Sequence, residues 1–205
     1  MKNILKAVEE LYTDNLEKFG TTSKAVGWNT IECQHLRFEK LVQFICKEQK
    51  ITINDLGCGY GAFFQFLTEK GFLVDKFYGY DISVPMLKTA KEIIGNDSRV
   101  ELINSPLLTN KADYSCVSGI FNVKCDADEL SWLNFILQTL DNLDAYSEKG
   151  FSFNLLTKYV DFRRDDLYYA NPGYFFDLCK TKYSKKVNLV HDYNLWEWTI
   201  TVDKN

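Results

Sequence analysis

The chain has 205 residues and a net charge of −4, with 46% hydrophobic and 25% charged residues. This is the composition of a folded globular domain, so predominant disorder is excluded, and general nucleic-acid binding, which needs a basic surface, is disfavoured. With six cysteines outside any CxxC pair, only two histidines and no apolar run of 18 residues, we expect no structural metal, no membrane span, and reduced thiols in a cytoplasmic protein.

Two helices are predicted before residue 50. Ile4, Leu5, Val8 and Leu11 repeat at helical spacing and predict a helix over residues 2–19. Residues 20–29 are rich in Gly, Thr and Ser and predict a loop, after which helical spacing returns over 30–48. We expect residues 1–50 to form a helical cap.

Short apolar runs alternate with helical patterns from residue 51 onward. Strands are predicted over 51–56, 76–81, 100–104, 114–122, 151–156, 187–193 and 196–202, and helices over 62–70, 84–94, 129–146 and 173–182. Such alternation builds parallel strands joined by right-handed crossovers, with helices on both faces. Only Asn194-Leu195 separates the last two strands, which predicts a hairpin and one antiparallel strand.

We therefore expect an α/β fold in a single domain of residues 1–205. Its core, residues 51–205, would be a doubly wound, Rossmann-like sheet of seven mostly parallel strands with an antiparallel C-terminal hairpin strand, preceded by the helical N-terminal cap. Sheets of this kind bind ligands at the carboxyl ends of their parallel strands. The functional residues should therefore lie where the strands end.

The first predicted strand ends in Asp55-Leu56-Gly57-Cys58-Gly59-Tyr60-Gly61. Glycines permit a sharp turn and a close approach by a ligand, and the following helix offers free N–H groups at its start. Asp81 ends the next strand about 20 residues further on, where a carboxylate can accept both hydroxyls of a ribose. These features predict a cofactor that contains a nucleoside.

Two cofactors fit this layout. Gly57, Gly59 and Ala62 match the loose dinucleotide pattern, which leaves an NAD-dependent oxidoreductase open. Asp55 favours a cationic amine over a pyrophosphate, and no second domain remains for a dehydrogenase substrate. With D-x-G-x-G-x-G after the first strand, residues 51–205 resemble the class I methyltransferases that use S-adenosylmethionine (SAM).

The resemblance implies roles for the matching residues. Asp55 and the glycines would hold the methionine part of SAM, Asp81 would bind the ribose, and Ile82 would pack on the adenine. An acid often follows the third strand and binds the adenine amine. Here Asn104 and Ser105 stand in its place, and either could accept that hydrogen bond.

On the fourth predicted strand, Gly119 and Phe121 would lie beside the sulfonium, because an aromatic face attracts a soft cation. From the cap, Trp28 and Gln34 would fold over the cofactor. The residues expected at SAM are, in full, Asp55, Gly57, Gly59, Gly61, Asp81, Ile82, Asn104, Ser105, Gly119, Phe121, Trp28 and Gln34.

A more local resemblance concerns the acceptor. Trp28 with Gln34 and Arg37, the run 118–122 and the run 191–193 are similar to small bacterial methyltransferases, some of them associated with surface-polysaccharide tailoring. This implies O- or N-methylation of a small polar acceptor, such as a sugar or a phosphorylated metabolite of capsule or surface-glycan synthesis. Methylation of protein or RNA and a non-catalytic partner subunit remain open. We expect a monomer or homodimer that binds neither nucleic acid nor membrane.

Residues at the other strand ends and in the loop 157–172 are candidates for catalysis and acceptor binding. The expected catalytic residues are His191, Asn122 and Tyr169. His191 would act as a general base because histidine titrates near neutral pH, although it could instead cap the hairpin. The expected acceptor-binding residues, which combine cations with aromatic rings, are Arg37, Arg163, Arg164, Tyr168 and Tyr193.

Overall fold

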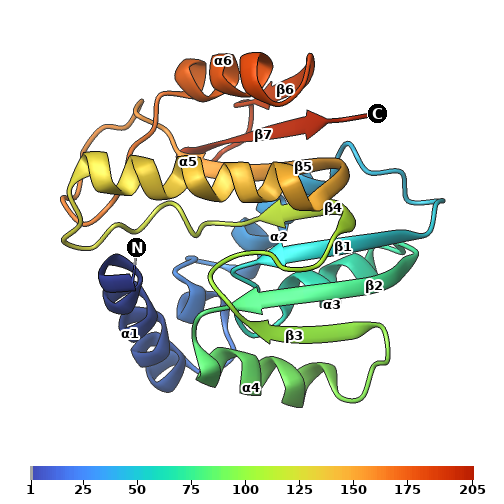
Figure 1. Cartoon of the computed structure of the whole chain (residues 1–205). Helices are drawn as coiled ribbons and strands as arrows, with labels where there is room; N and C mark the ends of the chain where they lie inside the picture. Colours follow the sequence, from blue (N-terminus) through green and yellow to red (C-terminus); the bar gives the residue numbers. More distant parts are fainter. Residues whose placement is uncertain (1) are drawn as a thin grey trace.

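Seven strands form one sheet in a computed structural model that describes residues 2–205 (Figure 1). They are β1 (Ile51–Leu56), β2 (Val74–Asp81), β3 (Val100–Asn104), β4 (Ala112–Val117), β5 (Ser147–Leu156), β6 (Lys186–Val190) and β7 (Glu197–Asp203). Their order in the sheet is β3-β2-β1-β4-β5-β7-β6, and only β7 runs antiparallel to its neighbours. The predicted fold class is confirmed.

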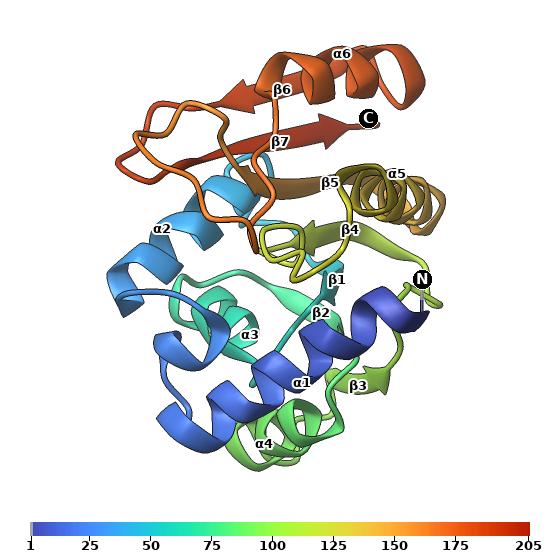
Figure 2. The same cartoon turned by 90° about the vertical axis from the view of Figure 1, so that its left-hand side faces the viewer.

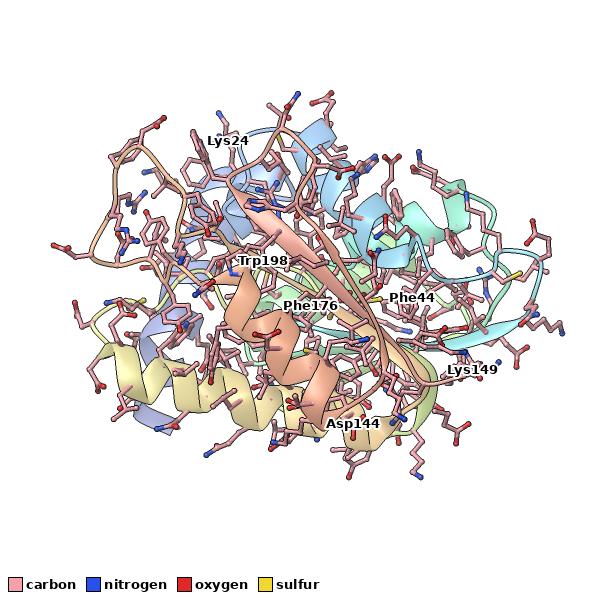
Figure 3. The ribbon with its side chains drawn as sticks, turned by 90° about the horizontal axis from the view of Figure 1, so that it is seen from above. Lys24, Phe44, Asp144, Lys149, Phe176 and Trp198 are labelled. Atoms are coloured by element: carbon pink, nitrogen blue, oxygen red, sulfur yellow. The ribbon has the colours of Figure 1, made fainter. Side chains whose placement is uncertain are left out.

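Helices cover both faces of the sheet. In chain order they are α1 (Lys2–Phe19), the short 3-10 helix η1 (Ser23–Val26), α2 (Ile31–Val42), α3 (Ala62–Glu69), α4 (Val84–Ile94), α5 (Glu129–Tyr146) and α6 (Pro172–Lys182). The apolar residues of α2 and α3 pack with β1 and β2 on one face, and those of α5 and α6 pack with β5 and β7 on the other. Figure 3 shows Trp198 of β7 beside α6, where it contributes to the second of these cores. None of the described helices has the length and apolar character that crossing a membrane requires.

The helix α1 lies across the carboxyl ends of the strands instead of packing on a face (Figure 2). It begins the chain as an amphipathic segment whose Val8 is buried. The hydroxyls of Thr13 and Ser83 are 2.9 Å apart, which joins α1 to the first turn of α4. The cap is therefore in position to cover whatever binds at this edge.

Several element boundaries differ from those predicted. The second helix ends at Val42 instead of residue 48, because the chain turns there while still burying Ile45 in the core. The fourth strand ends at Val117 instead of residue 122, since Gly119 adopts a left-handed conformation and starts a turn. The loop 20–29 contains η1, and the hairpin connection spans residues 191–196 instead of two residues.

Candidate active site

A pocket opens at the carboxyl ends of β1, β2 and β4, beneath α1 and η1. Its walls come from the glycine turn after β1, the loops after β2, β3 and β4, and the cap. The residues of the sequence motif and its surroundings that line it are Asp55, Gly57, Gly59, Asp81, Ile82, Ser105, Gly119, Trp28 and Gln34. Nine residues that the resemblance assigned to the cofactor are thus brought together around one space.

Asp55 places an unpartnered carboxylate oxygen in this wall. The side chain is buried at the end of β1, and within the described residues its Oδ2 has no hydrogen-bond partner. Burial, and then the nearby Asp81 carboxylate, raise the pKa of Asp55 well above its ordinary value. A buried acid without a donor is costly in free energy. The site therefore favours a ligand that brings a cationic donor to Asp55.

Asp81 is held by the backbone around it. Its Oδ2 accepts the Gly59 N–H at 2.8 Å, and its Oδ1 accepts the Ser83 N–H at 2.8 Å. Burial raises the pKa of Asp81, although these two hydrogen bonds favour the ionised form. Each oxygen retains a further lone pair, so the oriented carboxylate can accept two adjacent hydroxyls.

Two glycines permit the close packing of the wall. Gly57 and Gly119 both have positive φ angles, 84° and 80°. A Cβ on Gly57 would lie 2.1 Å from the Ile120 side chain, and a Cβ on Gly119 would lie 2.4 Å from the Trp28 ring. Neither position accepts another residue without displacing its neighbour. Glycine at these two positions is therefore required by packing as well as by access for a ligand.

Three residues expected at the cofactor lie outside the described pocket lining: Gly61, Asn104 and Phe121. Asn104 is exposed, and its amide donates to the carbonyl oxygens of Asp81 and Ile82, so it fixes the loop after β2. Phe121 lies in the turn beyond β4 and is fully buried against Phe135 and Phe153. Because the strand ends four residues before it, its ring points into the core instead of the pocket.

Arg37 and Asn122 belong to a buried polar network centred on Glu197. The Arg37 guanidinium donates to both Glu197 oxygens at 2.8 and 2.9 Å, and to the Cys33 carbonyl. Asn122 and Asn154 donate to the same carboxylate at 3.1 and 2.9 Å. The charge of Arg37, expected to meet an acceptor, is therefore already neutralised inside the protein.

This network, which we call the Glu197 network, reaches the pocket wall at two points. The Oδ1 of Asn154 accepts the Gly119 N–H at 2.8 Å. On the other side, the Arg37 guanidinium lies 3.7 Å from the centre of the Trp28 ring. Trp28 and Gly119 both line the pocket, whereas Glu197 and Arg37 stand behind them.

The remaining predicted catalytic and acceptor residues lie away from the described pocket lining. His191 is exposed, and its ring centre is 6.2 Å from that of Tyr159. Arg164 pairs with Asp166 at 2.6 Å and donates its backbone N–H to the Tyr169 hydroxyl.

Two other side chains that were expected to bind the acceptor make contacts elsewhere in the protein. Tyr168 is buried in the core, and the Tyr193 hydroxyl is 2.9 Å from that of Thr199. Arg163 is exposed near the Tyr169 ring. Burial raises the pKa of Tyr168 to about 12, which fits a structural side chain better than a proton acceptor.

The contribution of α1 and of two polar side chains to the pocket was not predicted from the sequence. Glu9 and Tyr12 of α1 line the pocket, and burial followed by the Asp81 charge raises the pKa of Tyr12. Tyr60 also lines it and donates to Gln34 at 3.3 Å. The Ser118 hydroxyl lines it as a buried oxygen without a partner in the described chain. The helical spacing of α1 identified an apolar stripe but not the surface that it would cover.

These features fit SAM. The unpartnered oxygens of Asp55 and Ser118 suit the ammonium group of its methionine part, and the oriented Asp81 carboxylate suits the ribose. Ile82, Met86 and Pro106 give an apolar end to the same pocket, where an adenine ring can be buried. The glycine turn leaves backbone, not side chains, between these two ends.

Known proteins support the same interpretation. Residues 54–130 match a methyltransferase-domain family. Over 155 residues, which are 75% of this chain and 93% of the relative, the chain is 48% identical to Rv1506c of Mycobacterium tuberculosis, whose name assigns it provisionally to the methyltransferases.

Two solved structures show the same fold. Magnesium protoporphyrin IX methyltransferase from Synechocystis PCC 6803 with bound SAH is similar at 13% identity and a TM-score of 0.68, with 98% of this chain and 99% of that one covered. The SAH complex of DhpI is similar at 11% identity and a TM-score of 0.69, covering 98% and 97%. Taken with the pocket and its glycine turn, these matches place the chain in the family of SAM-dependent methyltransferases.

Proposed function

We propose that the protein transfers the methyl group of SAM to an oxygen or nitrogen of a small polar acceptor, such as a sugar or a phosphorylated metabolite of surface-glycan synthesis. The observation that carries this proposal is the cover of the pocket by α1 and η1. A covered site suits an acceptor that can be engulfed, because closure excludes water from the reaction. Family membership removes the NAD-dependent alternative.

Within this proposal each wall of the pocket has a role. SAM supplies the activated methyl group when bound. Asp55 and Ser118 hold the ammonium, Asp81 holds the ribose, and Ile82 and Ser105 border the adenine. The protein then orients an acceptor in line with the bond that breaks, and this positioning is its main contribution.

The loops after β5 and before β7, which we call the aromatic rim, offer a surface for a ring-shaped acceptor. Tyr159, Phe162 and Trp196 are exposed at 59%, 73% and 54%, and they belong to the loops after β5 and before β7. Figure 2 shows the loop after β5 on the opposite side of the strand ends from α1. Lys158 lies over the exposed Tyr159 ring and Arg163 over the half-buried Tyr169 ring, and such pairs of a cation and an aromatic ring suit a sugar ring or an anion. This supports a glycan-related acceptor.

Proton removal depends on the acceptor. A neutral hydroxyl or amine needs a base, and His191 beside Tyr159 stands at this same rim. An anionic acceptor, such as a phosphate or a carboxylate, needs no base. In that case the exposed Arg163 contributes more than His191.

The proposal is tested by methyl transfer from radiolabelled SAM to separate pools of soluble sugars, sugar nucleotides and phosphate esters, with tRNA and intact protein assayed in parallel. Turnover confined to the soluble pools is the expected result. Efficient methylation of tRNA or protein with no turnover on any soluble compound would overturn it.

The rim is tested by Trp196→Ala against Leu130→Ala, which changes another exposed apolar side chain, on α5. The first should raise the KM of the acceptor while leaving SAM affinity unchanged, and the second should change neither. An acceptor KM that responds equally to both variants would contradict the placement of the acceptor.

A further inference from the structure

The Glu197 network contains two opposite full charges that no part of the methyl-transfer chemistry uses. Glu197 is fully buried on β7, and Arg37 is 7% exposed on α2. Their bidentate contact, with two further amide donors from Asn122 and Asn154, satisfies the carboxylate completely. Hydrophobic residues of the same volume would often be at least as stabilising. The charges therefore call for an explanation beyond packing.

The position of Glu197 and Arg37 relative to the pocket supplies such an explanation. The Arg37 guanidinium lies 3.7 Å from the Trp28 ring centre, and Trp28 forms the pocket wall together with Gly119. Glu197 reaches the same wall through Asn154 and the Gly119 N–H. A positive and a negative charge thus stand directly behind the wall where the methionine end of the cofactor is proposed to lie, in a region that excludes water.

We propose that Glu197 and Arg37 are positioning and specificity-determining residues that set the electrostatic potential at the cofactor sulfur, and thereby the preference for SAM over S-adenosylhomocysteine (SAH). The sulfur of SAM carries a positive charge, whereas that of SAH, left after methyl transfer, is neutral. The two ligands differ otherwise only in the methyl group, so a change in the ratio of their affinities between variants reports a change in the potential at that atom. Because the two charges are paired, the potential at this position does not repel the positively charged sulfur of SAM. The inference rests on the proposed placement of SAM but not on the identity of the acceptor.

The test measures the dissociation constants of SAM and SAH by calorimetry for purified full-length variants. Glu197→Gln keeps the shape of the side chain but replaces one accepting oxygen with an NH2 donor, so at most two of the four hydrogen bonds remain. It leaves Arg37 charged, because a guanidinium stays protonated when buried. The SAM-to-SAH affinity ratio should fall about tenfold, because an unpaired positive charge behind the wall repels the sulfonium of SAM but not the neutral sulfur of SAH.

Two further variants separate charge from structure. The double variant Glu197→Gln with Arg37→Gln loses the ion pair but carries no net charge, and its ratio should return to within about twofold of the unmodified protein. Lys40→Gln removes a partly exposed charge from the next turn of α2, where solvent screens it, and should leave the ratio unchanged. A network that only stabilises the fold would lower SAM and SAH affinities together, and most in the double variant.

Arg37→Gln provides an independent test of the proposal, which remains available if the Glu197→Gln variant does not fold. Because it leaves the Glu197 carboxylate without its cationic partner, it should raise the SAM-to-SAH affinity ratio instead of lowering it. Equal losses of SAM and SAH affinity in both single variants would overturn the inference. If Asp81→Ala leaves both affinities unchanged, the proposed placement of the cofactor fails instead, so the two failures are distinguishable.

Discussion

The two halves of the carboxyl edge of the sheet bury acids in opposite ways. On the side of β1 and β2, Asp55 has an oxygen without a partner in the described chain, and the pKa values of Asp55 and Asp81 are raised. On the side of β5 and β7, Glu197 is equally buried but accepts from Arg37, Asn122 and Asn154.

The two halves differ in whether the protein itself satisfies the buried acid. Buried polar groups are normally satisfied within the protein, so an unsatisfied one indicates a ligand that completes it. A satisfied network rigidifies the elements that it joins. By this criterion the half around β1 is built to receive a ligand, and the half around β7 is built to hold the wall. Changes in the first half should mainly affect binding. In the second half, changes that leave the two charges of the Glu197 network in place should mainly affect stability.

The largest expected effect is on binding through Asp81. Asp81→Ala leaves two ribose hydroxyls without an acceptor and should weaken SAH binding by about 2–4 kcal/mol. Calorimetry measures this directly. Asp75→Ala on the exposed side of the same strand is the matched control and should bind normally. Unchanged SAH affinity in the Asp81 variant would remove the distinction between the two halves.

A change in the satisfied half should instead lower stability. Asn154→Ala removes a donor to Glu197 and leaves the Gly119 N–H without its partner. We expect the free energy of unfolding in urea to fall by about 1–3 kcal/mol. Asn188→Ala, an exposed amide on β6, should stay within about 0.5 kcal/mol of the unmodified protein. Similar losses for both variants would show that the network contributes little.

Asp55→Asn should stabilise the ligand-free protein while weakening SAM binding. Since the pKa of Asp55 is raised in the folded state, the native protein binds more protons than the unfolded chain from pH 3.8 up to the raised value. Its stability therefore falls as pH rises through that window. The variant should remove this pH dependence and gain roughly 1 kcal/mol at neutral pH.

Urea unfolding at about pH 4.5 and pH 7.5 measures both effects, with the exposed Asp75→Asn as control. A variant that is less stable than the unmodified protein at neutral pH would show that the Asp55 carboxylate is satisfied in solution.

The smallest effect is expected outside both halves. Arg163 and Arg164 are exposed, and the Arg164 pair with Asp166 is a surface ion pair. The double change to Ala should alter the free energy of unfolding by less than about 0.5 kcal/mol and leave SAM affinity unchanged. Only the acceptor KM should rise. A loss of SAM affinity here would place these arginines at the cofactor after all.

The sequence predicted most of the fold because its signals are local. Helix α4 and strands β1 and β3 begin and end where the apolar pattern and the capping residues indicate. The end of β4 was misplaced, because apolar residues continue to Phe121 after the backbone has turned at Gly119. An apolar run does not show whether its side chains enter a core from a strand or from a turn.

Only those site residues whose roles follow from a local pattern could be predicted from the sequence. Asp55 and Asp81 follow from the glycine turn and the strand spacing. The role of Arg37 did not follow, because its partner Glu197 lies 160 residues away and neither local pattern indicates the other. Tyr12 was missed for the same reason, since the position of α1 over the strand ends is decided by tertiary packing.

The insertion of β7 between β5 and β6 has a consequence for how the protein forms during synthesis. β7 is the last strand in chain order, yet it pairs with β5 from Gly150 to Leu156. While ribosomes are still making the chain, β5 presents an unpaired edge, and Arg37 has no carboxylate to meet. The support behind the Trp28 wall of the pocket is therefore completed last, and a nascent chain lacking β7 would already have its glycine turn but no finished wall behind Trp28.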